Sequence, residues 1–411
     1  MEYLAVLGRQ PEISLAELEA LFSDVRQVSD NLALFNTKIA NIEGRKGKIY
    51  DFAAARPLGR VSEAKRASGA ERSDIIDRLS LREAPEICNF SINRLGGILK
   101  LAIKLEVKPL DYLKNLPTGK ITLGISDYST HASRKSAQLE ALKFKKILTR
   151  HGRSVRVLEN KQAVLSTATS LHNGLSGQNP RKVELIKLDN NWYRVTGVQD
   201  IDAYTRRDQA RPARDARVGM LPPKLAQILI NLCGPLPSGS RILDPFCGTG
   251  VVLQEALLMG YTAYGTDISE RMVEYSERNL NYFDFKNYKI EAGDATIFQW
   301  SQPIDAVACE GYLGQPMSQI PTEIELKEQQ QECKSIILGF LKNLMSQIKS
   351  GTPAVIAVPA WLRSDGTYKR LEVLAFLDDL GYNVNNKSRE GLIYCREGQI
   401  VARDILILRK K

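Results

Sequence analysis

The chain has 411 residues, a formal net charge of +10 and 43% hydrophobic residues. This length predicts two or three domains, and no apolar run approaches the roughly 20 residues that a membrane-spanning helix needs. The first residues lack the order of a secretory signal, in which basic residues precede an apolar stretch. Six cysteines and three histidines are scattered without paired spacing, which favours free thiols over disulfides or a zinc site. We therefore predict a cytoplasmic protein with no metal and no membrane partner.

The positive charge is confined to the first half of the chain. Residues 1–217 contain 37 Lys and Arg against 25 Asp and Glu, whereas residues 218–411 contain 20 against 22. Between His131 and Arg156, eight basic residues face a single acid, Glu140. A solvated basic surface would explain the excess of positive charge, but the local clustering of basic residues favours a surface that binds a polyanion such as RNA.

The first 115 residues predict a small α+β domain. Tyr3–Leu7 is a short apolar run, and alternating patterns at Leu32–Asn36 and Leu99–Val107 predict strands. Ser14, followed by Glu17, has the spacing of a capping box that opens an amphipathic helix. Residues 40–85 are weakly patterned and receive no assignment.

Residues 116–205 predict a second small unit. Its helix, Ser136–Leu148, has an apolar face, and its basic residues fall largely on the remaining surface. The candidate strands are Ile121–Ile125, Val155–Leu158, Val183–Leu188 and Trp192–Val198.

A stretch rich in arginine and proline, Asp200–Pro223, predicts a linker. It is either a solvated hinge or a clamp for phosphates, because the guanidinium group can donate two parallel hydrogen bonds to an anion. We favour the clamp. The candidate RNA-binding residues are therefore Arg134, Lys135, Lys143, Lys145, Lys146, Arg150, Arg207 and Arg211.

From Lys224 onward, strands and helices alternate. Spacing of this kind predicts a parallel sheet covered on both faces. Helices are expected at 251–259, 270–280, 325–350 and 369–380. The last two strands, near Leu392–Cys395 and Ile400–Leu408, are separated by too few residues for a parallel crossover, so we predict an antiparallel pair.

The strongest local motif is Asp244-Pro-Phe-Cys-Gly-Thr-Gly250, where a strand ends in an acid and a glycine-rich turn opens a helix. The third glycine of the dinucleotide fingerprint is replaced by Leu253, which argues against NAD. An acid at this position would repel a pyrophosphate but suits a ligand with a cationic amino group. A purely structural tight turn is the alternative.

Two further acids follow the next two strands. Asp267 closes the second strand, where a carboxylate can accept hydrogen bonds from a ribose diol, although on its own it would more often cap a helix. Asp294 follows the third strand and is placed to bind an adenine amino group.

The fourth strand ends in Cys309-Glu310-Gly311-Tyr312. Ligands of open parallel sheets lie beyond the carboxyl ends of the strands. Glu310 and the Gly311 carbonyl would accept the two hydrogens of an exocyclic base amine while Tyr312 stacks on the base. The alternative is a strand-end acid and a core tyrosine. Cys247 and Cys309 have no nearby histidine and are interpreted as packing residues.

These motifs together resemble the class I S-adenosylmethionine-dependent methyltransferases. More closely, they resemble the archaeal and eukaryotic THUMP-domain tRNA guanosine-N2 methyltransferases that act on position ten. The matching segments are Leu7–Leu18, Arg94–Gly97, Arg207–Asp215, Gly219–Ala226 and Asp244–Gly250. The resemblance implies an α/β chain, with a Rossmann-like methyltransferase domain at 206–411. A ferredoxin-like α+β domain at 1–115 and a THUMP-like RNA-binding domain at 116–205 would precede it.

The resemblance also implies S-adenosylmethionine as cofactor, tRNA as partner, and Glu310, Gly311 and Tyr312 as catalytic residues. The family usually has Asp-Pro-Pro-Tyr where this chain has Glu310-Gly311-Tyr312, one residue shorter and without prolines. Methylation of another amino group, in ribosomal RNA or DNA, and a non-catalytic RNA-binding role remain alternatives. The implied cofactor-binding residues are Asp244, Pro245, Phe246, Gly248, Gly250, Asp267, Ile268, Asp294 and Ala295.

Overall fold

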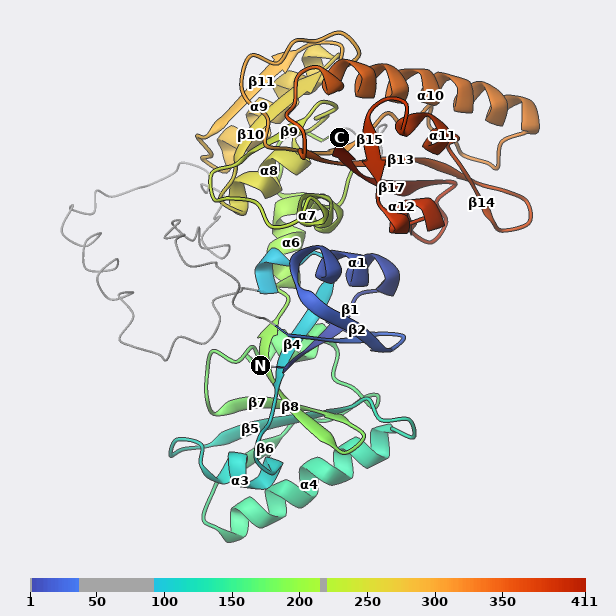
Figure 1. The fold of residues 1–411 in the computed structure, drawn as a ribbon. Helices are drawn as coiled ribbons and strands as arrows, with labels where there is room; N and C mark the ends of the chain where they lie inside the picture. Colours follow the sequence, from blue (N-terminus) through green and yellow to red (C-terminus); the bar gives the residue numbers. More distant parts are fainter. Residues whose placement is uncertain (1, 37–91, 215–219) are drawn as a thin grey trace, which may run out of the picture.

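The computed structural model describes residues 2–36, 92–214 and 220–411, and the unassigned stretch 40–85 lies outside them. Figure 1 shows two bodies, each built on one sheet, with the second sheet and its helices formed by the C-terminal part of the chain.

The first sheet has the strand order β2-β3-β1-β4-β8-β7-β5-β6. Antiparallel pairing of β4 with β8 makes it continuous across residue 115, where sequence analysis divides two domains. That division remains a prediction. The strands are β1 (Glu2–Leu7), β2 (Ser23–Ser29), β3 (Leu32–Asn36), β4 (Ile98–Lys104), β5 (Ile121–Asp127), β6 (Val155–Val157), β7 (Lys182–Leu188) and β8 (Asn191–Val198).

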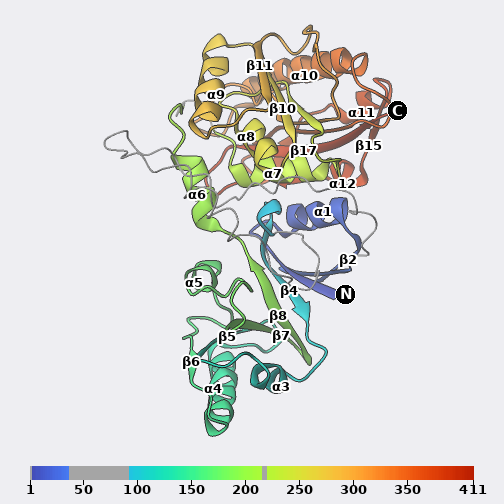
Figure 2. The same ribbon diagram turned by 90° about the vertical axis from the view of Figure 1, so that its left-hand side faces the viewer.

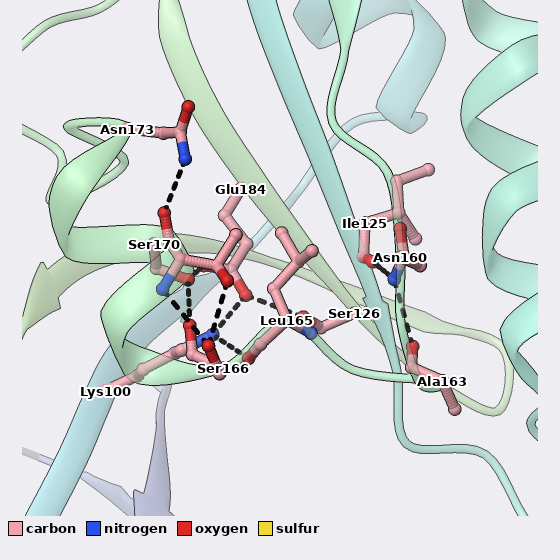
Figure 3. Close-up of polar contacts among 11 residues, drawn as sticks. Lys100, Ile125, Ser126, Asn160, Ala163, Leu165, Ser166, Ser170, Asn173 and Glu184 are labelled. Carbon is pink, nitrogen blue, oxygen red and sulfur yellow. Dashed lines mark hydrogen bonds and ion pairs between the residues drawn. The ribbon is translucent and has the colours of Figure 1, made fainter.

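A buried ion pair joins the two halves of this sheet (Figure 3). Lys100 on β4 reaches across β8 and donates to Glu184 Oε1 on β7 at 2.6 Å and to the Leu165 carbonyl at 2.8 Å. The hydroxyls of Ser126 and Ser170 each donate to the same carboxylate at 2.6 Å. All four side chains are buried, so the charge of Glu184 is balanced entirely by protein groups.

The helix predicted at 136–148 is confirmed as α4 (Arg134–Arg150), which begins two charged residues earlier. Ser133 caps it and accepts from the Ser136 backbone N–H at 3.0 Å. Its buried residues, Ala137, Ala141, Phe144 and Leu148, form one stripe against β5. The first sheet also carries η1 (Ile92–Arg94), α3 (Pro109–Lys114) and α5 (Thr167–His172).

The second sheet has the order β11-β10-β9-β12-β13-β17-β15. The first five strands are parallel, and β17 lies antiparallel between β13 and β15. The predicted antiparallel closing pair is confirmed as β16 with β17. The strands are β9 (Arg241–Asp244), β10 (Thr262–Asp267), β11 (Tyr288–Ala292), β12 (Ala306–Glu310), β13 (Pro353–Leu362), β14 (Tyr368–Arg370), β15 (Tyr382–Val384), β16 (Ile393–Tyr394) and β17 (Val401–Lys410).

Helices cover both faces of the second sheet, as predicted. One face packs against α10, with Val307, Ile356 and Leu406 in the shared core, and the other packs against α7 and α8. The helices of this part of the chain are α6 (Ile201–Gln209), α7 (Pro223–Leu232), α8 (Val251–Leu258), α9 (Glu270–Tyr282), α10 (Glu323–Met345), α11 (Leu374–Leu377) and α12 (Asn386–Glu390).

Two element predictions in this region are wrong. The helix expected at 369–380 is mostly absent, because β13 runs past the sheet and pairs with β14 as a hairpin, which leaves only α11 helical. The predicted linker Asp200–Pro223 begins with a helix, α6, because Asp200 caps it by accepting from the Ala203 backbone N–H at 2.8 Å.

The capping box predicted at Ser14 and Glu17 is also wrong. Helix α1 (Pro11–Leu21) begins four residues earlier, with Gln10 and not Ser14 as its N-cap, so both residues lie inside the helix. Their side chains make tertiary contacts instead: Ser14 donates to the Gly97 carbonyl at 2.8 Å. Glu17 accepts from the backbone N–H groups of Gly96 and Gly97 at 2.9 and 2.8 Å.

Glu17 lies at the contact between the two bodies, where α1 rests against α7 (Figure 2). The Asn231 side chain on α7 donates to Glu17 Oε1 at 2.7 Å and to the Arg94 carbonyl at 2.6 Å. Ile13 and Ala16 pack into the apolar core formed by α7 and the second sheet. Polar and apolar contacts of α1 therefore fix the orientation of the two bodies.

Stability should depend on pH through Glu17. Burial raises its pKa from an ordinary 4.5 to about 7, although hydrogen bonds from Asn231, Gly97 and Gly96 oppose this. The folded state then holds a proton that the unfolded state has lost, so the free energy of unfolding falls as pH rises from 4.5 to 7. Glu17→Gln is expected to remove about 3 kcal/mol of this decline.

Urea unfolding at pH 5 and pH 8 measures the effect. Glu19→Gln is the matched control, because Glu19 is on the same helix but half exposed. Curves of stability against pH that run parallel for wild type and Glu17→Gln would contradict this role of Glu17.

Candidate active site

The glycine-rich turn joins β9 to α8 and needs glycine at two positions. Gly248 and Gly250 have φ angles of 51° and 79°, in the left-handed region. A Cβ atom on Gly250 would lie 2.9 Å from Ser276 Oγ, whereas one on Gly248 would meet no atom closer than 3.9 Å. The backbone therefore packs tightly against α9 at Gly250 and leaves open space at Gly248. A ligand can approach the backbone there.

Three carboxylates gather at the carboxyl ends of neighbouring strands: Asp244 on β9, Asp267 on β10 and Glu310 on β12. Burial raises the pKa of each of them, and the charges of Asp267 and Glu310 raise the pKa of Asp244 further. Mutual repulsion means that the cluster gains from a bound positive charge. Its chemistry fits a cationic ligand, as the sequence predicted.

Asp267 binds the turn to the second strand. Its Oδ2 accepts from the Gly248 backbone N–H at 2.9 Å, and its Oδ1 accepts from the Ser269 N–H at 2.9 Å. Ser269, and not Asp267, is the N-cap residue of α9. Each carboxylate oxygen retains capacity for another hydrogen bond, so ribose binding by Asp267 stays a prediction that this geometry accommodates.

The edge beyond β10 and β11 exposes two large apolar side chains. Ile268 is 75% exposed and Ile297 is 73% exposed, next to Asp294, whose Oδ1 accepts from the Thr296 backbone N–H at 2.8 Å. Ala295 is buried in the core. Exposed aliphatic side chains beside strand-end acids suit an aromatic ring such as adenine. The sequence predicted Ile268 and missed Ile297, which carries no local motif.

Glu310, Gly311 and Tyr312 occupy the end of β12. Glu310 Oε1 accepts from Arg403 Nε at 2.7 Å, and both residues are largely buried. The Gly311 N–H donates to the Ala357 carbonyl at 2.9 Å, and the Tyr312 hydroxyl donates to Glu332 at 3.1 Å. Sequence analysis missed Arg403, because nothing in a strand pattern shows which strand-end side chain reaches across the sheet.

The basic residues predicted on α4 are exposed, at the end of the molecule remote from the second sheet in both views (Figures 1 and 2). Arg134 and Lys135, with Gln138 and Leu139, line a hollow of about 410 Å³. The exposed basic residues of α4 are Arg134, Lys135, Lys143, Lys145, Lys146 and Arg150, and we call them the α4 basic face.

The prediction that Arg207 and Arg211 clamp phosphates needs correction. Arg207 is 4% exposed and donates to both oxygens of Glu255 on α8, at 2.9 and 3.2 Å. Arg211 is 3% exposed and donates to Asp208 at 2.9 Å and to Thr249 of the glycine-rich turn at 3.2 Å. Both arginines fasten the segment after β8 to the second body: Arg207 pairs there with the acid Glu255, whereas Arg211 pairs with Asp208 of its own segment and reaches the second body through the Thr249 hydroxyl.

Parts of the chain match known families. Residues 236–360 match a family model described as "Methyltransferase domain", and residues 160–278 match one described as "DNA methylase". A relative named tRNA (guanine(10)-N2)-dimethyltransferase, from Methanothermobacter thermautotrophicus, is 32% identical over 38% of this chain and 44% of its own length. Another relative of the same name, from Pyrococcus abyssi, is 49% identical over 23% of this chain and 29% of its own. The matched region thus spans less than half of either relative.

Among solved structures, TrmN from Thermus thermophilus aligns over 100% of both chains, with a TM-score of 0.45 and 15% identity. In the described residues, no helix has the length and apolar character to cross a bilayer. Nor do those residues bring three His, Cys, Asp or Glu side chains together in an arrangement that could hold a metal ion.

Proposed function

We propose that this protein is an S-adenosylmethionine-dependent methyltransferase that modifies the exocyclic N2 of a guanosine in tRNA. The observation that carries the proposal is the carboxylate cluster beside the glycine-rich turn, at the carboxyl edge of a parallel sheet in which β17 alone among the strands of its main path is reversed. The "Methyltransferase domain" match covers this edge, and the relatives' name supplies the substrate class.

The residues present fit this cofactor. The open backbone at Gly248 gives close approach, Asp244 and Asp267 provide negative charge and hydrogen-bond acceptors, and Ile268 provides an apolar surface. When bound, the cofactor supplies a methyl group on a positively charged sulfur. Pro245, Phe246, Gly250, Asp294 and Ala295 complete the proposed binding set.

Glu310 and Gly311 would then orient the substrate. The Glu310 carboxylate and the Gly311 carbonyl would each accept one N–H of the base amine, which would direct the nitrogen lone pair toward the methyl group to be transferred. Glu310 also receives the proton that the nitrogen loses as its new bond to carbon forms. Tyr312 would border the base, with its hydroxyl held by Glu332 and Gln315.

We further propose that the N-terminal body, with ferredoxin-like and THUMP-like parts, holds the RNA in the cytoplasm. The α4 basic face supports this role, because six exposed cations on one helix can neutralise several phosphates at once. Its distance from the catalytic edge means that an RNA must bridge both bodies.

The function is tested by incubating the protein with labelled cofactor and total tRNA, ribosomal RNA or duplex DNA, and then digesting the products to nucleosides. We expect the label in N2-methylated guanosine from tRNA alone. Label in adenosine from DNA would favour the alternative that the "DNA methylase" match raises. Binding of tRNA with no transfer at any pH would favour a non-catalytic role.

Charge reversal on α4 should weaken tRNA binding. Lys143→Glu with Lys146→Glu is expected to raise Kd more than about tenfold and to flatten the slope of log K against log salt by about 1 to 2. Lys342→Glu with Lys349→Glu, two exposed lysines of the second body, is the matched control. Electrophoretic mobility shifts at several salt concentrations give both values. Equal losses in the two variants would argue against a localised site on α4.

A further inference from the structure

Arg403 makes a directed contact with the proposed catalytic carboxylate from two strands away. It lies on β17 opposite Pro359, and Glu310 lies on β12 opposite Ala357, so the arginine side chain crosses β13 at the edge of the sheet. The bond from Nε to Glu310 Oε1 is 2.7 Å, and Arg403 Nη1 donates to Gln399 Oε1 at 3.2 Å. The guanidinium is therefore held at both ends.

This contact leaves the carboxylate able to bind a substrate. Arg403 uses Oε1 of Glu310, and an ionised carboxylate has about four acceptor sites on its two oxygens. Glu310 is 17% exposed as a side chain, whereas Arg403 is 5% exposed. The acid thus retains an accessible surface, while the arginine behind it is closed off.

The charges around Glu310 come from several elements. Burial raises its pKa, and Arg403 and, more weakly, Arg396 of the turn between β16 and β17 oppose that rise. Asp244 on β9 and the Cys309 thiol are the other titratable groups that interact with it. Of these neighbours, only Arg403 donates a hydrogen bond to the acid, so its removal should shift the protonation of Glu310 most.

The residue after Arg403 on β17, Asp404, belongs to a second arginine–acid pair. Asp404 on β17 is paired with Arg370 of β14 at 2.6 Å, and it is 1% exposed. Side chains alternate along a strand, so Asp404 points to the opposite face of the sheet from Arg403. Both pairs join an arginine to a largely buried acid, yet only the Arg403 pair includes a group at the proposed catalytic edge.

We propose that Arg403 is the positioning residue of the proposed reaction, holding Glu310 in the orientation that accepts the base amine. This inference rests on the proposed function. Arg403 replaces the rigidity that a proline pair after the acid would give, since the strand end here continues as Glu310-Gly311-Tyr312. It also keeps the carboxylate ionised and ready to take the amine proton.

An ionised Glu310 further favours guanine over adenine. Guanine presents both N1–H and N2–H as donors on its Watson–Crick edge, and a carboxylate can accept the two together. Adenine presents an acceptor at N1, which a carboxylate repels. The selectivity for guanine is therefore tied to the Arg403 contact.

The experiment compares Arg403→Met, Arg403→Lys and Arg370→Met. For each variant, kcat is measured as a function of pH from 5.5 to 9. We expect Arg403→Met to move the acidic limb of this profile upward by at least about one pH unit, which means about tenfold lower kcat on that limb, with kcat partly recovered at high pH. Arg403→Lys should shift the acidic limb less, and Arg370→Met should leave the limb in place while lowering the unfolding temperature.

A second readout does not need turnover. In protein labelled with ¹³C at glutamate carboxyls, the Glu310 signal is assigned by its loss in Glu310→Gln, and its titration midpoint is followed by NMR. We expect a higher midpoint in Arg403→Met than in wild type and no change in Arg370→Met. Identical midpoints in wild type and Arg403→Met would overturn the inference. If wild type transfers no methyl to guanosine, the proposed function fails, and the NMR midpoint still decides whether Arg403 controls Glu310.

Discussion

Replacing Glu310 with glutamine is expected to lower kcat by about 100-fold to 1,000-fold. The glutamine amide has nearly the same shape and can still accept from Arg403 Nε, so the fold should be retained. It carries no charge to stabilise the nitrogen as it becomes positive, and it cannot take the proton. Cofactor affinity should change by less than about twofold, because the glycine-rich turn and Asp267 are untouched.

Single-turnover methyl transfer measures the effect on the catalytic step, and calorimetric titration of the cofactor measures the effect on cofactor affinity. Glu390→Gln, on the exposed surface of α12, is the control for a lost charge and should match wild type in both. If the Glu310→Gln defect appeared mainly as weaker cofactor binding, Glu310 would belong to the cofactor site and not to the catalytic step.

The second large effect concerns stability. Lys100→Met is expected to lower the free energy of unfolding by about 3 to 5 kcal/mol, because it leaves the Glu184 carboxylate buried without a cation. Ser126 and Ser170 would still donate to that carboxylate, but neutral hydroxyls cannot balance its charge (Figure 3). The defect should fall on the first sheet, where the pair spans β4 and β7.

The double variant Lys100→Met with Glu184→Gln tests the cause. It should recover a large part of the loss, since no unpaired charge then remains. Lys104→Met, at a partly exposed position of the same strand, should cost less than about 1 kcal/mol. Urea unfolding followed by circular dichroism measures all three. A loss for Lys100→Met no larger than that for Lys104→Met would show that the pair is energetically unimportant.

Local pattern was sufficient for much of the second body. The alternation after Lys224, the acid before the glycine-rich turn and the short connection before β17 each depend on neighbours within a few residues, and the structure confirms most of the elements they predict, the helix expected at 369–380 excepted. The same holds for α4, whose apolar period and basic surface are both local properties. The roles assigned to Asp244, Asp267, Asp294 and Glu310 remain predictions that the geometry accommodates.

Local pattern failed where a polar side chain found its partner far away in the sequence. Ser14 and Glu17 have the spacing of a cap, yet Ser14 donates to Gly97, and Glu17 accepts from Gly96, Gly97 and Asn231, because buried polar side chains must find hydrogen-bond partners wherever the fold supplies them. Arg207 and Arg211 lie in an arginine-rich segment typical of a phosphate clamp, yet both are buried and form ion pairs with Glu255 and Asp208.

The sequence by itself therefore determined the strand and helix order of the second body up to β13, its glycine-rich turn, the acids at its strand ends and the basic surface of α4. Only the tertiary structure decided that the first sheet is continuous, that Glu17 joins the two bodies, and that Arg403 holds Glu310. The physical reason is that periodicity and turn chemistry act over a few residues. Buried charges, in contrast, must be paired by whichever strand the fold brings beside them.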